Sequence, residues 1–480
     1  MGKLHKRRKG YSDEELDEEE TDLEDDIDDE EDDIEEDDDE EEDEEEDEED
    51  RRAYRHRRRV RNQIIVYLVI LFMVLGIAGG GFVIGRKVFS IVQQKRQEAE
   101  LARAEKEAAE EEPPEEEMVI DTPEPVKEEP EEEEDLLGGL AESYYSEMPI
   151  ETKVAGLFMV TPEAITGVRT ATQAGEGTQE ALNQYAVGGL IYFGDNIQDK
   201  DQISTMLAST ASKSSYPVFL AVDEEGGEVS RVANSKVEVT KVDDMAAIGA
   251  GGDASKAAEA GATIGSYLKE IGFNVDFAPV ADVAGEGSAL GNRSFGSDPQ
   301  AVGEMVANAV SGIEGTGVSA CLKHFPGLGS TTEDTHDGRV EIAKSIDEMR
   351  NSDFVPFSAG IEAGADFVMV SHAAAPALDE ENIPSSLSKK VITDVLRGEL
   401  GFEGVVITDA LDMAAITEYY PPEEAAVMAL EAGADMLLMP EDFEKAYNAV
   451  LAAVQDGTIS EERIDESLDR IYRVKCKDKL

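Results

Sequence analysis

Eight short apolar runs recur between residues 150 and 440 and decide what this chain can fold into. They occupy residues 154–160, 187–193, 218–222, 275–280, 318–322, 367–370, 405–408 and 436–439. Because these runs are continuously apolar rather than alternating, they predict strands that are buried on both faces, as in a parallel sheet covered by helices.

Stretches with helical periodicity separate the later runs. They lie at residues 254–271, 301–315, 357–363, 389–400, 423–432 and 464–474. Strands that alternate with such helices predict an α/β fold, and eight of them suit a closed (β/α)8 TIM barrel over residues 136–480. A doubly wound open sheet is the competing architecture.

The acidity of the chain belongs to a tail. Of the formal net charge of -66, much falls between Asp13 and Asp50, where the residues that are not acidic are Leu16, Thr21, Leu23, Ile27 and Ile34. Such a block repels itself and buries nothing, so residues 1–62 are predicted to be a disordered acidic tail that ends in an arginine cluster. Its sign argues against a nucleic-acid partner.

An uncharged run at residues 64–85 follows the arginine cluster. It is long enough to cross a bilayer, so residues 63–86 are predicted to be a single transmembrane helix. Because arginine is denser before the run than after it, the N-terminus is expected in the cytoplasm and the remainder outside the cell membrane. Residues 87–135, rich in Glu, Ala and then Pro, are predicted to be a charged helical spacer and linker.

The chain has only two cysteines, Cys321 and Cys476. Two are too few for a disulfide framework, and neither has a partner at metal-ligand spacing. We therefore predict no metal site and no cofactor, and oligomeric state is left undetermined.

Polar residues follow several of the predicted strands. They are Asp223, Asp282, Lys323, His324, His372 and Asp409. In a barrel, the residues just past the strand ends converge on one face, so these side chains are expected to meet in a carboxylate-rich pocket.

The segment from Lys323 to His336 has the composition of an active-site loop. Its Pro, Gly, Ser and Thr residues continue neither a helix nor a strand, and it carries Asp334 and His336 two residues apart. The chain has only five histidines, three of which lie near predicted strand ends. A plain turn capped by polar side chains is the simpler alternative.

This loop is similar to the signature of the β-N-acetylhexosaminidases of glycoside hydrolase family 3. Further segments agree with that family in order, at residues 222–231, 272–283, 293–296, 368–372 and 405–413. The resemblance covers roughly residues 150–475. It implies an exo-acting hydrolase that removes N-acetylglucosamine from cell-wall-derived or related glycans, and the predicted transmembrane helix would anchor this hydrolase in the membrane.

The resemblance also implies roles for individual residues in a retaining double displacement. It places the nucleophile on Asp409 and the acid/base on His336, with Asp334 as its partner. It places substrate binding on the residues Asp223, Arg231, Arg293, Lys323 and His324. A histidine acid/base departs from the usual pair of carboxylates.

Several positions differ from the family pattern. Leu328, Ser330 and Thr335 stand where the family usually has His, Asp and Ser. Glu224 and Glu228 replace Gln and Arg and are expected to alter the charge of the substrate site.

Three other functions compete with the hexosaminidase. The first is a β-glucosidase-type exo-glycosidase, which the Asp334/His336 pair and the lack of a further domain after the predicted barrel disfavour. The second is a lyase that forms a Schiff base through Lys323. The third is an inactive, membrane-tethered glycan-binding module.

Overall fold

The computed structural model describes residues 135–333, 335 and 338–479. The predicted acidic tail, the membrane span at 63–86 and the linker up to residue 134 lie outside them. Among the helices that are described, none is both long and apolar enough to cross a membrane.

Eight parallel strands form one nearly closed sheet. They are β1 (Phe158–Val160), β2 (Gly189–Ile191), β3 (Phe219–Val222), β6 (Val275–Asp276), β7 (Ser319–Phe325), β8 (Phe367–Val370), β9 (Val405–Thr408) and β10 (Leu437–Leu438). The sheet order is β10-β1-β2-β3-β6-β7-β8-β9. A parallel bridge from Ile407 to Met436 joins the two ends of the sheet, which gives the predicted barrel arrangement.

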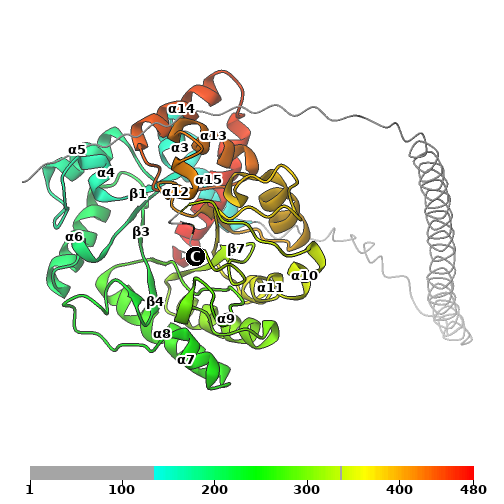
Figure 1. Cartoon of the computed structure of the whole chain (residues 1–480). Coiled ribbons are helices and arrows are strands. Elements are labelled where there is room, and N and C mark those ends of the chain that lie inside the picture. Colours follow the sequence, from blue (N-terminus) through cyan, green and yellow to red (C-terminus); the bar gives the residue numbers. More distant parts are fainter. Residues whose placement is uncertain (1–134, 334, 336–337, 480) are drawn as a thin grey trace, which may run out of the picture. The chain divides into compact units, whose positions relative to one another are not determined.

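Helices surround this sheet. They are α2 (Leu136–Tyr145), α3 (Ile150–Ala155), α4 (Pro162–Thr166), α5 (Glu176–Gln184), α6 (Lys200–Lys213), α7 (Met245–Ala250), α8 (Ala254–Ile271), α9 (Pro299–Glu314), α10 (Ile346–Asn351), α11 (Phe354–Glu362), the π-helix η4 (Lys390–Glu399), α12 (Ala414–Thr417), α13 (Pro422–Ala432), α14 (Phe443–Gln455) and α15 (Glu461–Cys476). Figure 1 shows α6, α8, α9, α11 and α14 around the central strands. A small antiparallel hairpin, β4 (Glu224–Gly226) and β5 (Val229–Ser230), follows β3.

Local sequence explains where the long helices begin and end. Asp298 accepts hydrogen bonds from the amides of Gln300 and Ala301 at the start of α9, and Pro299 occupies its first turn. Helix α8 ends at Gly272, whose φ of 117° suits glycine. The predicted α8 boundaries are confirmed.

Burial explains why the strands could be recognised. Every residue of the eight strands is buried. The prediction for residues 154–160 is wrong in its first half, because Pro149 and Gly156 bound helix α3 and the strand begins only at Phe158. A buried helix end and a buried strand give the same apolar signal.

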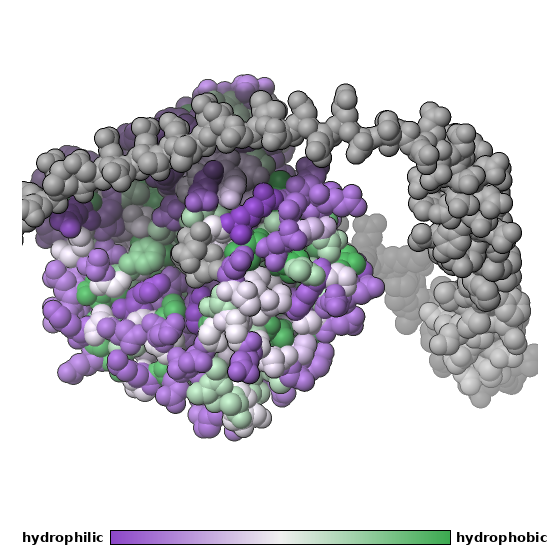
Figure 2. All heavy atoms as spheres, in the orientation of Figure 1, coloured by the Kyte–Doolittle hydropathy of each residue, from purple (hydrophilic) through white to green (hydrophobic). Residues whose placement is uncertain are grey.

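On the face seen in Figure 2, hydrophobic residues form small patches among hydrophilic ones. The exposed large hydrophobic residues of the described part are Leu136, Val168 and Tyr419. Both cysteines are buried and neither forms a disulfide, with Cys321 on β7 and Cys476 at the end of α15.

A charge cluster around Asp435 closes the N-terminal end of the barrel. Asp435 is fully buried and accepts hydrogen bonds from Arg397 at 2.5 Å, Arg470 at 3.1 Å and Ser467 at 2.9 Å. Its Oδ2 also accepts from the amide of Val406 at 2.9 Å. These bonds tie β9 and β10 to η4 and α15.

Candidate active site

A cavity of about 390 Å³ opens at the C-terminal ends of the strands, and we call it the strand-end cavity. Its polar lining is Asp223, Glu225, Arg231, Arg293, Lys323, His324, Asp409 and Asp412. Its apolar lining is Ile191, Phe193, Val229, Phe277, Met369, Ala410, Met413, Leu438 and Met439. Most of the charges come from β3, the β4–β5 hairpin and β7, and the apolar side chains lie mainly on β2, β8 and β10 or just after them.

Lys323 lies between two of the carboxylates that line the cavity. Its Nζ lies 2.8 Å from Asp223 Oδ1 and 2.7 Å from Glu225 Oε1. Burial alone would lower the pKa of Lys323, but the two carboxylates raise it well above the usual value. Lys323 is therefore a fixed cation, which argues against the Schiff-base hypothesis.

Glu225 binds the second cation of the cavity. Arg293 donates to it from Nε and from Nη2, both at 2.8 Å, in a bidentate pair. Burial would raise the pKa of Glu225, but Lys323 and Arg293 lower it to about 2. The carboxylate thus stays ionised and sets the positions of both cations.

His324 is held from both ring nitrogens. Its Nδ1 lies 2.8 Å from Asp282 Oδ2, and its Nε2 lies 3.3 Å from Arg293 Nη2. Because arginine only donates, Nε2 accepts, and the proton lies on Nδ1 toward Asp282. Asp282 also accepts from the amides of His324 at 3.0 Å and Leu328 at 2.6 Å, so one buried carboxylate orients both the ring and the start of the loop.

Arg231 is the third cation of the cavity lining. Its Nη2 lies 3.8 Å from Asp223 Oδ2, and its guanidinium lies 5.7 Å from the centre of the Phe193 ring. Its buried Nε has no hydrogen-bond partner among the described residues. The Arg231 side chain as a whole is 37% exposed and lines the cavity, so its terminal N–H groups can donate to a ligand.

Asp409 follows β9 and faces the cavity. Its Oδ1 accepts from the amide of Ala410 at 2.8 Å. Burial would raise the pKa of this carboxyl, but electrostatic interactions with the His372 and His324 rings, the Ala410 hydrogen bond and the charge of Lys323 bring it below the usual value. Asp409 is thus an ionised carboxylate with one oxygen held by the backbone.

His372 bonds the turn that follows Asp409. It is fully buried and lies outside the cavity lining, so the prediction that it belongs to the pocket is wrong. Its Nε2 lies 2.8 Å from the carbonyl oxygen of Ala410, and its Nδ1 lies 2.8 Å from Ser386 Oγ. The carbonyl only accepts, so Nε2 carries a proton.

The loop after β7 packs closely against its neighbours. A Cβ on Gly329 would lie 2.0 Å from the carbonyl oxygen of Val283, and one on Gly327, whose φ is 125°, would lie 2.7 Å from Asp353. Glycine is therefore required at both positions. Leu328 and Ser330 are two of the positions that differ from the family pattern. Leu328 is buried and Ser330 is exposed, and neither residue lines the cavity.

The two proposed acid/base residues, Asp334 and His336, lie outside the described residues. Thr335, between them in sequence, is described and buried. Its carbonyl oxygen accepts from the amide of Ala415, at 3.4 Å, in the helix α12 that begins shortly after Asp409.

The cavity contains six of the eight predicted site residues: Asp223, Arg231, Arg293, Lys323, His324 and Asp409. Lys323 and His324 lie within β7 rather than after it, and Asp282 supports His324 from outside the lining. Glu225, Asp412 and Met439 were missed. Glu225 lies two residues after Asp223, and the two-residue period of an extended chain was a signal that could have found it.

Glu224 and Glu228 were expected to alter the charge of the substrate site, but neither side chain contacts the cavity. Glu224 is fully buried and Glu228 is exposed, and neither lines the cavity. In the described part of the chain, no group of three or more His, Cys, Asp or Glu residues is arranged to hold a metal ion.

Comparison with known proteins shows the family of this chain. The family described as "Glycosyl hydrolase family 3 N terminal domain" matches residues 149–474. Beta-hexosaminidase A of Pseudoalteromonas piscicida is 34% identical over 331 residues, which cover 62% of this chain and 54% of that protein. A beta-hexosaminidase of Stenotrophomonas maltophilia is 38% identical over 274 residues, which cover 56% and 81% of the two chains.

A solved structure agrees with the sequence matches. The glycoside hydrolase family 3 beta-N-acetylglucosaminidase from Paenibacillus superposes with a TM-score of 0.65 at 37% identity, covering 69% of this chain and 63% of that one. This chain therefore spans less than two thirds of two of these three proteins.

Proposed function

The chain belongs to glycoside hydrolase family 3, and from that premise we propose that it is an exo-acting, retaining β-N-acetylhexosaminidase. Its substrates would be glycans with a terminal, non-reducing N-acetylglucosamine, including those derived from cell walls. The observation that carries the proposal is the ionised carboxylate of Asp409, which faces the cavity shared with Asp223, Arg231, Arg293, Lys323 and His324.

Asp409 is the proposed nucleophile. In the first step its carboxylate attacks the anomeric carbon, and the bond from that carbon to the leaving oxygen breaks. A lowered pKa keeps the attacking group charged, and the Ala410 amide holds one oxygen while the other is available for bonding. The product of this step is a glycosyl ester on Asp409.

His336 is the proposed acid/base, with Asp334 orienting its ring. As an acid, the imidazolium gives its proton to the leaving oxygen; once neutral, it takes a proton from the water that cleaves the ester. Support comes from Thr335, the residue between the two, whose carbonyl contacts α12 next to the turn that follows Asp409.

The charged half of the cavity suits the hydroxyl groups of a sugar. Carboxylates accept hydrogen bonds from hydroxyls, while Lys323, Arg293 and Arg231 donate to them. The apolar lining residues, which include Met369, suit the methyl of an acetamido group, whereas glucose has only a hydroxyl at that position. This contrast favours the hexosaminidase over a β-glucosidase.

We also propose that residues 63–86 anchor the enzyme in the cell membrane, with the acidic tail in the cytoplasm. The uncharged run and the arginine cluster before it support this arrangement. Accessibility of cysteines introduced at residue 40 or residue 120 to a membrane-impermeant thiol reagent tests it. Labelling of intact cells at 120 but not at 40 is expected, and the reverse pattern would refute the topology.

Trapping with a 2-deoxy-2-fluoro glycosyl fluoride tests the mechanism. Mass spectrometry is expected to find the adduct on the peptide that carries Asp409, and a label on another residue would refute the nucleophile. Rates on nitrophenyl N-acetylglucosaminide and nitrophenyl glucoside test the substrate. Faster glucoside cleavage would favour the glucosidase, and glycan binding without turnover would favour the inactive module.

A further inference from the structure

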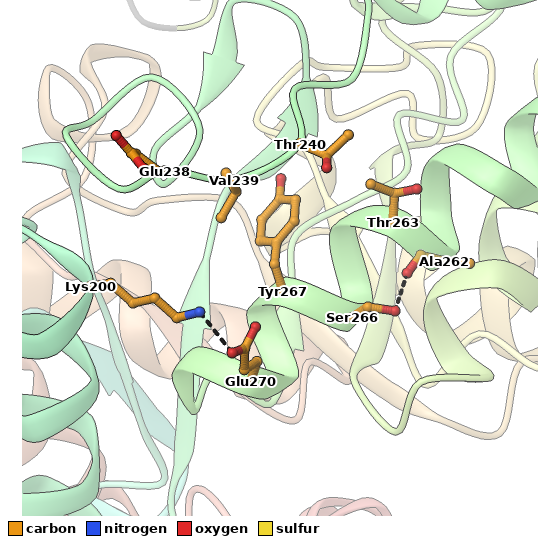
Figure 3. Close-up of a pocket in the computed structure, with 9 residues that line it drawn as sticks. All are labelled: Lys200, Glu238, Val239, Thr240, Ala262, Thr263, Ser266, Tyr267 and Glu270. Atoms are coloured by element: carbon orange, nitrogen blue, oxygen red, sulfur yellow. Dashed lines mark hydrogen bonds and ion pairs between the residues drawn. The ribbon is translucent and has the colours of Figure 1, made fainter.

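Four cavity residues, Asp223, Glu225, Val229 and Arg231, lie on the β4–β5 hairpin or directly next to it in sequence. A surface groove is lined by Tyr267, which contacts this hairpin. It has a volume of about 590 Å³ and is formed by Lys200, by the outer face of α8 and by residues 238–240. Figure 3 shows Tyr267 projecting from α8 toward Val239 and Thr240, with the Lys200–Glu270 ion pair at one end. Tyr267 is only 8% exposed, so most of its side chain packs in the interior.

The Tyr267 hydroxyl bonds a buried carboxylate on that hairpin. It donates to Glu224 Oε1 at 2.7 Å. The same oxygen accepts from the amide of Ala233 at 2.8 Å, and Oε2 accepts from the amide of Val232 at 2.7 Å. Three donors thus converge on a side chain with no exposed surface.

Glu224 joins the two parts of the hairpin. In sequence Glu224 lies between the cavity residues Asp223 and Glu225. The amides that donate hydrogen bonds to it belong to Val232 and Ala233, which directly follow Arg231. The segment beyond them returns to the hairpin, where the amide of Gly227 donates to the carbonyl of Val242 at 3.1 Å. The residues between these two anchors include 238–240, which cover Tyr267.

From these contacts we infer that Glu224 and Tyr267 are a positioning pair that sets Asp223, Glu225 and Arg231 in place for the substrate. The inference rests on the proposed function for its kinetic consequence only. Neither side chain lines the strand-end cavity, so both act through the hairpin.

The pair requires a carboxylate rather than an amide. Glu224 faces backbone N–H groups from both of its oxygens, so in either orientation a glutamine would turn its NH2 group toward an N–H donor. The hairpin of this chain is therefore built around the acid.

The decisive experiment uses variants of Glu224 that separate the shape of its side chain from its ability to accept hydrogen bonds. Glu224→Gln keeps the shape and loses an acceptor, whereas Glu224→Asp keeps the carboxylate and loses a methylene. Tyr267→Phe removes one donor. Tyr447→Phe is the matched control, because Tyr447 is 7% exposed and its hydroxyl donates to the carbonyl of Glu151, 3.3 Å away and remote from the hairpin.

Two readouts are measured on the same proteins. For Glu224→Gln and Tyr267→Phe, KM for nitrophenyl N-acetylglucosaminide is expected to rise about tenfold, the scale of one hydrogen bond to a charged group, with a smaller change in kcat. Amide hydrogen exchange of residues 229–235 is expected to speed up in both variants. Glu224→Asp is expected to lie between wild type and Glu224→Gln.

The outcomes separate this inference from the proposed function. If wild type does not cleave the substrate, the proposed function fails and hydrogen exchange still tests the pair. The pair is refuted if exchange at residues 229–235 stays at the wild-type rate in Glu224→Gln, or if Tyr447→Phe changes it equally. It is also refuted if Glu224→Asp is more harmful than Glu224→Gln, since only shape would then matter.

Discussion

The two ends of the barrel each hold a cluster of opposite charges, and the clusters are bonded differently. At the N-terminal end, three arginines surround Asp435 and also donate to backbone carbonyls, as Arg397 does to Phe402 and Gly404 and Arg463 does to Ala434. At the C-terminal end, Lys323 and Arg293 have side-chain partners and line a cavity. The first cluster uses its donors to close the fold, whereas the second keeps its charges facing a ligand site.

The largest effect is expected at Asp409. Asp409→Asn removes the proposed nucleophile but keeps its shape, so kcat/KM for nitrophenyl N-acetylglucosaminide should fall by about 10³-fold or more. The melting temperature should stay close to that of wild type. An enzyme with full activity would show that chemistry occurs elsewhere.

Next comes Asp435→Ala at the opposite end. It leaves three partly buried arginines without their fully buried carboxylate, so the free energy of unfolding should fall by about 3–5 kcal/mol, measured by urea denaturation. The kcat/KM per folded molecule should not change. A large fall in kcat/KM would mean that the N-terminal cluster also shapes the cavity, and the comparison would fail.

Lys323→Met should affect activity more than stability, the reverse of Asp435→Ala. The loss of a cation that contacts Asp223 and Glu225 should lower kcat/KM by about ten- to a hundredfold, the scale of a charge-assisted hydrogen bond. Arg293 still pairs with Glu225, and Asp223 is partly exposed, so the free energy of unfolding should change less than in Asp435→Ala. If Lys323→Met is the less stable of the two variants, the C-terminal cluster is mainly structural.

The smallest effect is a pH dependence at Asp276 on β6. Burial, and then the charge of Glu224, raises the pKa of this carboxyl well above its usual value. The folded state therefore favours the protonated acid, and wild-type stability is lost as pH rises above the unfolded pKa of about 3.9. Asp276→Asn should match wild type near that pH and become the more stable protein as pH rises, measured by melting temperature. A difference that does not vary with pH would contradict this.

The sequence predicted the scaffold well because the strands are buried on both faces. The run at 367–370 and the run at 405–408 match β8 and β9 residue for residue. The run at 154–160 failed because apolar burial does not distinguish the end of α3 from β1.

The site was predicted less completely, since its details depend on side chains that meet only in the fold. Arg293 and Glu225 are far apart in sequence, yet they form the bidentate pair that positions Lys323. His372 has the same strand-end signal as Asp409, but it lies outside the cavity lining and bonds the carbonyl of Ala410. Position after a strand therefore predicts proximity to the site, not the direction of a side chain.

The two buried cysteines make this protein convenient for fluorescence. Burial raises the pKa of the Cys321 and Cys476 thiols, so both should resist alkylating dyes in the native state. One cysteine introduced at the exposed position Glu333 would then take up a fluorophore selectively, without removal of the native thiols. Its emission during turnover would report, in real time, on the loop that carries the proposed proton donor.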